Sequence, residues 1–158
     1  MDVNSFLESI AGAELSFSFS ASEISAGRPP EKMDALFHLP LLALATMVIA
    51  RNKKSFPTSS LGRVVAQLLI EHFNALHQAP HGLETSITLR RRCAEALAFL
   101  EAAGLTDISS DRQRLITLSQ NGKSHLDRAA QNETDLGLLV RQLRISQQRV
   151  IARYGDER

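Results

Sequence analysis

Residues 86–126 constrain the fold of this chain more than any other segment, because their apolar pattern changes from helix to strand periodicity and back. In the first part, apolar residues recur every three or four positions, which is typical of an amphipathic helix. We expect this helix to begin after Ser86 or Thr88, to run to Ala103 and to stop at Gly104, a residue that ends helices well. Its predicted buried face consists of Leu89, Cys93, Ala96, Leu97 and Leu100.

A short hairpin and a second helix are expected to follow. Residues 105–108 and 114–118 predict two strands joined by the polar turn at residues 109–111, and Ser119 is a suitable cap for a helix that continues to about Ala130. A helix, a hairpin and a second helix in this order form the second half of a winged helix-turn-helix. In such a fold the helix at residues 86–103 would be the recognition helix, and the hairpin would be the wing. The predicted fold is mainly α with a small β wing.

Two further helices are expected before this segment. The first begins near Pro40 and runs to Arg51, and it is apolar on nearly every side, as a central buried helix should be. A basic loop, 52–57, then leads to a second helix that starts at Thr58 or Ser59 and continues to His77. The expected buried stripe of this second helix consists of Val65, Leu68, Leu69, His72, Phe73 and Leu76.

The N-terminal residues 1–34 have a different pattern. Leu15, Phe17 and Phe19 alternate with serines, and this strict period of two predicts a half-buried strand. A single strand is not stable alone, so it must lie on the wing sheet, on a helix or on another chain. We therefore treat residues 1–34 as an N-terminal extension with a strand-like segment, ahead of a winged-helix domain at residues 35–131.

Residues 132–158 predict a long C-terminal helix, over about 133–154. Its apolar positions are spaced four, three, four, three and four apart, which is a heptad seam with one polar member. Periodicity alone leaves two alternatives open, because such a seam can pack on its own domain or on a second chain as a dimer. The seam consists of Leu136, Val140, Leu143, Gln147, Val150 and Tyr154.

Composition excludes several classes of protein. The net charge is +1, so DNA contact would have to come from local patches. Cys93 is the only cysteine, which rules out an intramolecular disulfide and a thiolate-rich metal site and favours a small buried side chain. The most apolar window, 35–50, is shorter than a membrane span and no secretory signal is visible, so we expect a cytoplasmic protein.

The sequence lacks the common catalytic motifs, including a phosphate-binding glycine loop, a zinc-protease helix and a hydrolase elbow. His77 and His81 are four residues apart, but Pro80 lies between them and no third ligand is apparent. Glu71 beside His72 is a poorly supported acid/base pair. We therefore expect no enzyme activity, no cofactor and no metal site.

Basic residues are the strongest functional candidates. Three successive arginines open the predicted recognition helix, two more lie on the wing, and others precede the second helix or lie on the fourth. Exposed cations at these places suit contact with DNA phosphates. The candidate DNA-binding residues are Arg90, Arg91, Arg92, Arg112, Arg114, Lys53, Lys54 and Lys123.

The outer face of the predicted recognition helix argues against base reading. Only Arg91 could make a bidentate contact with guanine, and Glu95 and Glu101 would approach the phosphates unfavourably. Alanines fill much of the rest of this face and suit close packing on another protein. The face favours backbone contact or protein assembly over sequence recognition.

The motifs in this region resemble those of a known family. An arginine-rich helix ending in Gly104-Leu105, a helix start at residues 119–122 followed by Leu126, and a long helix at 135–154 are similar to the middle components of bacterial ABC-three-component systems. The same segments look like generic MarR- or PadR-like winged-helix proteins and the winged-helix subunits of SMC complexes. The first resemblance covers residues 36–154 and implies a small subunit beside an SMC-like ATPase, a setting that includes Lamassu-type anti-phage defence. The strand-like segment at residues 13–24 departs from both regulator families.

Two functional hypotheses follow. The leading one is a non-catalytic winged-helix subunit of a DNA-acting, SMC-like ATPase complex, which binds protein partners and contacts double-stranded DNA through its backbone. The alternative is a homodimeric transcriptional regulator that binds a palindromic operator. The candidate interface residues, for a protein partner or a second copy, are Leu15, Phe17, Phe19, Leu136, Val140, Leu143, Val150 and Tyr154.

Overall fold

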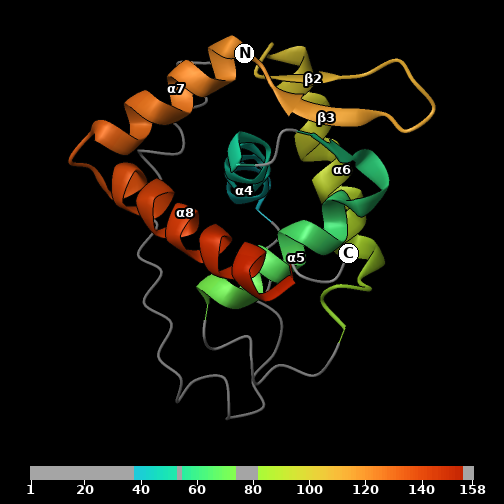
Figure 1. Cartoon of the computed structure of the whole chain (residues 1–158), viewed down its shortest axis with the longest axis horizontal. Helices are drawn as coiled ribbons and strands as arrows, with labels where there is room; N and C mark the ends of the chain where they lie inside the picture. Colours follow the sequence, from blue (N-terminus) through green and yellow to red (C-terminus); the bar gives the residue numbers. More distant parts are fainter. Residues whose placement is uncertain (1–37, 53–54, 74–81, 155–158) are drawn as a thin grey trace.

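The protein is mainly helical, with one small antiparallel sheet, as the sequence predicts (Figure 1). The computed structural model describes residues 38–52, 55–73 and 82–154. The predicted strand at Leu15, Phe17 and Phe19 lies outside these ranges. The elements are α4 (Leu39–Asn52), β1 (Phe56–Pro57), the 3₁₀ turn η1 (Thr58–Ser60), α5 (Leu61–His72), α6 (Ile87–Ala102), β2 (Thr106–Ile108), β3 (Leu115–Leu118), α7 (Gln120–Gln131) and α8 (Asp135–Tyr154).

Helix α4 is the centre of the fold. Every residue from Leu41 to Ala50 is buried, and the helix packs against α5, α6, α7, α8 and β3, which surround it in Figure 1. Its one buried hydroxyl, on Thr46, donates a 2.8 Å hydrogen bond to the carbonyl oxygen of Leu42. A helix without a polar face can be stable only in such a position, so the sequence prediction of a central helix near residues 40–51 is confirmed.

The sheet has the order β1-β3-β2 and is antiparallel throughout. Thr106 pairs with Leu118 and Ile108 with Ile116 in the hairpin, close to the predicted strands. Strand β1 was not expected, since residues 52–57 were interpreted as a loop. It has two residues, one of them Pro57, and it pairs with the first half of β3. A strand this short has no periodicity to detect, and proline suits an edge strand.

Side-chain hydrogen bonds hold the turn of the hairpin. One carboxylate oxygen of Asp111 accepts from the Ser109 hydroxyl at 2.8 Å and from the backbone N–H groups of Gln113 and Arg114 at 3.0 and 2.9 Å. The Ser109 hydroxyl oxygen in turn accepts from the backbone N–H of Leu115. Arg114 adopts a left-handed backbone with φ of 47°, which an L-residue takes only where the surroundings fix it.

Helix α6 agrees closely with its prediction. The Ser86 hydroxyl caps its start by accepting from the backbone N–H of Leu89, and Gly104 follows its end with φ of +69°. All five residues predicted for its core face are buried. Burial raises the pKa of the Cys93 thiol to about 12, so this side chain behaves as a small hydrophobe.

Helix α5 is shorter than predicted. It ends at His72, because Phe73 has an extended backbone with φ of −99° and ψ of 91° and packs its ring edge-on to His72. The sequence prediction placed the end after His77, at the proline and glycine that follow. Within the predicted stripe, Val65, Leu68 and Leu69 are fully buried and Phe73 is partly buried against the core, whereas Leu76 lies outside the described residues.

Helix α8 packs on its own domain. Val140, Leu143 and Gln147 are fully buried, and the helix packs against α4, α5 and α7 (Figure 1). Of the two alternatives that periodicity left open, the seam therefore takes the intramolecular one, and these residues do not face a second chain. The Tyr154 side chain lies outside the described part of the structure. Within the described ranges, no helix is both long and apolar enough to cross a lipid bilayer.

Gln147 is the one polar residue of this seam, and its burial reduces the stability of the protein. Its side chain is fully buried, and neither its amide oxygen nor its amide nitrogen has a hydrogen-bond partner. An unpaired buried polar group costs roughly 1–3 kcal/mol. We expect Gln147→Leu to raise the free energy of unfolding by about 1–3 kcal/mol, measured by urea denaturation, while the same change at exposed Gln148 has little effect. A destabilised Gln147→Leu variant would contradict this prediction, because it would show that contacts of the amide stabilise the protein by more than the free energy that its burial costs.

Candidate nucleic-acid interface

The hairpin turn and the start of α5 lie at the same end of the sheet. Strand β1 runs antiparallel to β3, so its last residue, Pro57, is opposite Leu115, the first residue after the turn. The backbone N–H of Thr58 then donates a 3.1 Å hydrogen bond to the carbonyl oxygen of Arg114. This bond fixes η1, and with it the first turn of α5, against the base of the hairpin.

The first turns of α5 and α6 lie against each other. A Cβ atom added at Gly62 would be 2.7 Å from Cγ of Arg90 and 3.3 Å from its Cα, so the absence of a side chain at residue 62 permits the contact. Arg63, exposed in the same turn of α5, is therefore brought close to the arginines that open α6. These two contacts thus hold the start of α5, the start of α6 and the base of the hairpin together, and each of the three carries exposed arginines.

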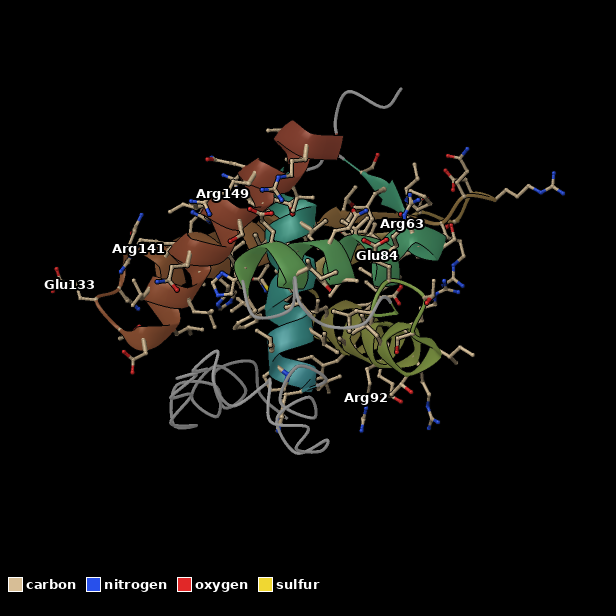
Figure 2. The ribbon with its side chains drawn as sticks, turned by 90° about the horizontal axis from the view of Figure 1, so that it is seen from below. Arg63, Glu84, Arg92, Glu133, Arg141 and Arg149 are labelled. Carbon is tan, nitrogen blue, oxygen red and sulfur yellow. The ribbon has the colours of Figure 1, made fainter. Side chains whose placement is uncertain are left out.

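We call this surface the basic edge. Figure 2 labels Arg63 and Arg92, and both lie to the right of α4, with Arg63 above α6 and Arg92 below it. All of its arginines are exposed. The basic edge consists of Arg63 on α5, Arg90, Arg91 and Arg92 on α6, and Arg112 and Arg114 in the hairpin turn.

Two of these arginines share one carboxylate. Glu95 accepts from Arg91 at 3.3 Å and from Arg92 at 3.0 Å, and the Arg91 side chain is 81% exposed. Exposed pairs of this kind stabilise a protein by about 0–1 kcal/mol, so the guanidinium groups can exchange Glu95 for another anion at little cost. Asp111 is held in the turn by its own hydrogen bonds and makes no ion pair with Arg112 or Arg114 within the described residues, although its negative charge lies beside theirs.

Arginines at the start of α6 oppose the helix dipole. The first turn of a helix carries partial positive charge, which favours acidic residues, yet α6 has no acidic residue there. Only Arg90 lies in this first turn, because α6 begins at Ile87, and Arg91 and Arg92 lie in the second turn. The unfavourable interaction of the arginines with the helix dipole is therefore slight. An exposed guanidinium group beside a positive helix end is compatible with binding of a phosphate.

The structure brings most of the predicted DNA-binding residues together. Arg90, Arg91, Arg92, Arg112 and Arg114 lie on the basic edge, whereas Lys53 and Lys54 lie outside the described residues. Lys123 lies elsewhere, because α7 begins at the end of β3 that is farthest from the turn (Figure 1). It is thus not part of this surface.

Arg63 is the residue that the sequence analysis missed. It lies in the first turn of α5, at an exposed position next to Gly62. A single arginine in an apolar helix gave no signal in the sequence. Its position in the second helix of the predicted helix-turn-helix, close to the end that faces the recognition helix, could have identified it.

Several arginines away from the basic edge have structural partners. Asp127 accepts from Arg144 at 2.6 Å and from Arg51 at 3.5 Å, which joins α4, α7 and α8 and lowers the pKa of this carboxyl, chiefly through the Arg144 hydrogen bond. Arg141 donates to the carbonyl oxygens of Ala130 and Asn132 at the end of α7. These cations stabilise the fold.

Glu71 and His72 do not form an acid/base pair. The buried Glu71 carboxylate accepts a 2.7 Å bond from Arg153, and Nδ1 of His72 lies 3.3 Å from the Ser146 hydroxyl. Both contacts connect the end of α5 to α8. Burial lowers the pKa of His72, which favours its neutral form in the folded protein.

The His72 environment predicts a pH dependence of stability. Because the folded-state pKa lies below the ordinary value of 6.5, the unfolded chain takes up the proton first as the pH falls. The stabilisation that neutral His72 contributes to the folded protein is present in full above pH 6.5. It is lost as the pH falls through the folded-state pKa of His72. We expect the free energy of unfolding to fall more steeply below pH 6.5 in the wild type than in His72→Gln, measured by urea denaturation across this range. Parallel curves would contradict this.

The described ranges contain no group of three or more His, Cys, Asp or Glu side chains placed to hold a metal ion. His77 and His81, the only histidine pair with ligand-like spacing, lie outside those ranges. Comparisons with protein-family models, with curated proteins and with solved structures found no match to this chain.

Proposed function

We propose that this chain is a winged-helix protein that binds the backbone of double-stranded DNA through its basic edge, without catalytic activity. The order of the elements supports the winged-helix interpretation. A helix, a short strand, two further helices and a hairpin, with the first strand paired to the second strand of the hairpin, is the connectivity of that fold. In this interpretation α6 is the recognition helix and the hairpin is the wing.

The basic edge is the observation that carries the proposal. In winged helices that bind DNA, the start of the second helix, the recognition helix and the wing contact one duplex. Here the same three places carry exposed arginines, and two tertiary contacts join the elements that carry them, Thr58 to Arg114 and Gly62 to Arg90. A net charge of only +1 makes this local concentration of arginines more informative.

The exposed face of α6 favours contact without sequence recognition. Beyond Arg92, the exposed or half-exposed positions of α6 are Ala94, Glu95, Ala98, Phe99, Glu101 and Ala102. None of them is an Asn or Gln that could pair with adenine, and the two glutamates would repel phosphates deeper in the groove. Binding through the first turn of α6 and through the wing fits the phosphate backbone better.

The setting that we propose is a complex with an SMC-like ATPase, in which this chain is a small cytoplasmic subunit that connects protein partners to DNA. Anti-phage defence is one role for such a complex. The resemblance of residues 36–154 to the middle components of ABC-three-component systems supports it. The partner surface would include the alanine-lined part of α6. Isolation of the full chain with its gene neighbours, followed by co-purification, tests this part of the proposal.

A salt series separates this proposal from a homodimeric regulator. We expect the full chain to bind duplexes of unrelated sequence equally, with log K falling linearly against log salt, since phosphate contacts release counterions. Electrophoretic mobility shifts at several salt concentrations measure both properties. Selective binding to one palindrome, persisting at physiological salt, would favour the regulator, with two α6 helices about 34 Å apart. Absence of binding even at low salt would exclude DNA contact by this chain alone.

A further inference from the structure

The outer surface of α8 carries two parallel rows of exposed residues, although its inner seam is already buried. Residues seven apart lie on the same side of a helix, so each row follows one line along the surface. The two large members of the apolar row, Leu138 and Ile145, are 48% and 51% exposed. The apolar row is Leu138, Ile145 and Ala152, and the polar row beside it is Asp135, Gln142 and Arg149.

The charges of the polar row are complementary to the same row of a second copy only when the two helices run antiparallel. It runs from an acid through a neutral amide to a base. If a second α8 lies antiparallel across a twofold axis near Gln142, Asp135 of each copy faces Arg149 of the other, and Leu138 lies close to Ile145. A parallel pair would place Asp135 against Asp135 and Arg149 against Arg149. Residues at these flanking positions set the orientation of paired helices.

The charged residues of this row are available for such a contact. Asp135 and Arg149 are both exposed, and neither makes an ion pair within the part of the chain that the structure describes. Arg141, which would otherwise bring two like charges near the axis, is turned toward α7, where its guanidinium donates to two backbone carbonyl groups. The surface thus presents apolar side chains with unpaired charges of opposite sign at its two ends.

We propose that this face of α8 binds the same face of a second copy of the chain, as an antiparallel, twofold-symmetric pair. The sequence-based dimer hypothesis used the opposite face of this helix, which packs on α4, α5 and α7 instead. Figure 2 shows Arg141 and Arg149 on the side of α4 opposite Arg63 and Arg92, so the pair leaves both basic edges open. The pairing does not rest on DNA binding.

Charge reversal in two separate variants tests the pairing. In Arg149→Asp each copy would bring acid against acid, and in Asp135→Arg base against base. In an equimolar mixture, one copy of each restores two opposite-charge contacts. Sedimentation equilibrium of the full-length wild type should show a mass that rises with concentration from 17.4 kDa toward about twice that value. Each variant alone should have a dissociation constant about tenfold or more higher, and the mixture should return to the wild-type value.

Arg63→Asp is the matched control, because it makes the same charge change on the basic edge. It should leave the association unchanged and weaken DNA binding if the proposed function is correct. A wild type that stays at 17.4 kDa at every concentration would overturn the pairing. Variants that associate like the wild type, or a mixture that fails to recover while both variants remain folded by circular dichroism, would overturn it too.

Discussion

Replacement of Arg90, Arg91 and Arg92 with alanine is expected to weaken binding to duplex DNA by about 10²–10³-fold at 0.1 M salt. Each phosphate contact releases close to one counterion, which contributes about 1.2 kcal/mol at this salt concentration. Loss of three contacts should also reduce the slope of log K against log salt by ~3. The three side chains are exposed at the start of α6, so the fold should tolerate the change. Mobility shifts over a salt series measure the affinity and the slope together.

The control is a variant with the same loss of charge elsewhere. Arg51, Lys123 and Arg128 lie on α4 and α7, away from both the basic edge and the pairing face of α8, and their replacement with alanine removes three positive charges as well. We expect this control to lose much less affinity, because only the general field of the protein changes. Equal losses in both variants would mean that net charge, and not the basic edge, governs the binding.

Gly122→Ala is expected to destabilise the protein by about 2–4 kcal/mol. A Cβ atom at this position would lie 2.1 Å from the carbonyl oxygen of Leu105 and 2.8 Å from a side-chain carbon of Leu118. The oxygen belongs to the backbone and accepts a 3.0 Å hydrogen bond from the N–H of Ser119, so it cannot move without loss of that bond. The clash outweighs the ~1 kcal/mol by which alanine favours a helix over glycine.

Thermal unfolding measures this effect, with an expected fall in Tm of roughly 5–15 °C for a domain of this size. Ser124→Ala is the control, because Ser124 lies on the same helix and is exposed. It should change the stability by no more than about 0.5 kcal/mol. A Gly122→Ala protein as stable as the wild type would show that α7 can move away from the hairpin without cost.

Helix α6 shows what sequence patterns predict well. Its core face was identified residue by residue, because a helix that packs on one side needs apolar side chains at a fixed spacing. Its ends were identified too, since Ser86 and Gly104 act through local backbone chemistry. The same local signals located the hairpin and the Ser119 cap of α7.

Features that depend on distant partners were not predictable. Strand β1 exists only because Phe56 pairs with Ile116, far along the chain. Helix α5 ends where Glu71 and His72 contact α8, a position that the proline and glycine beyond Phe73 do not indicate. Arg63 joins the basic edge only through the contact between Gly62 and Arg90. In each case the deciding interaction joins segments that are separate in sequence.

The segment at residues 86–126 determined by itself that the chain contains an amphipathic helix, a hairpin and a capped helix, because period and capping are local properties. Helix α8 shows the limit of such reasoning. Its sequence determined that one face is apolar, while only the tertiary structure decided that α4, α5 and α7 cover that face and that Leu138 and Ile145 remain exposed on the other. A hydrophobic period indicates that a helix face must be buried, but it does not indicate which partner buries that face.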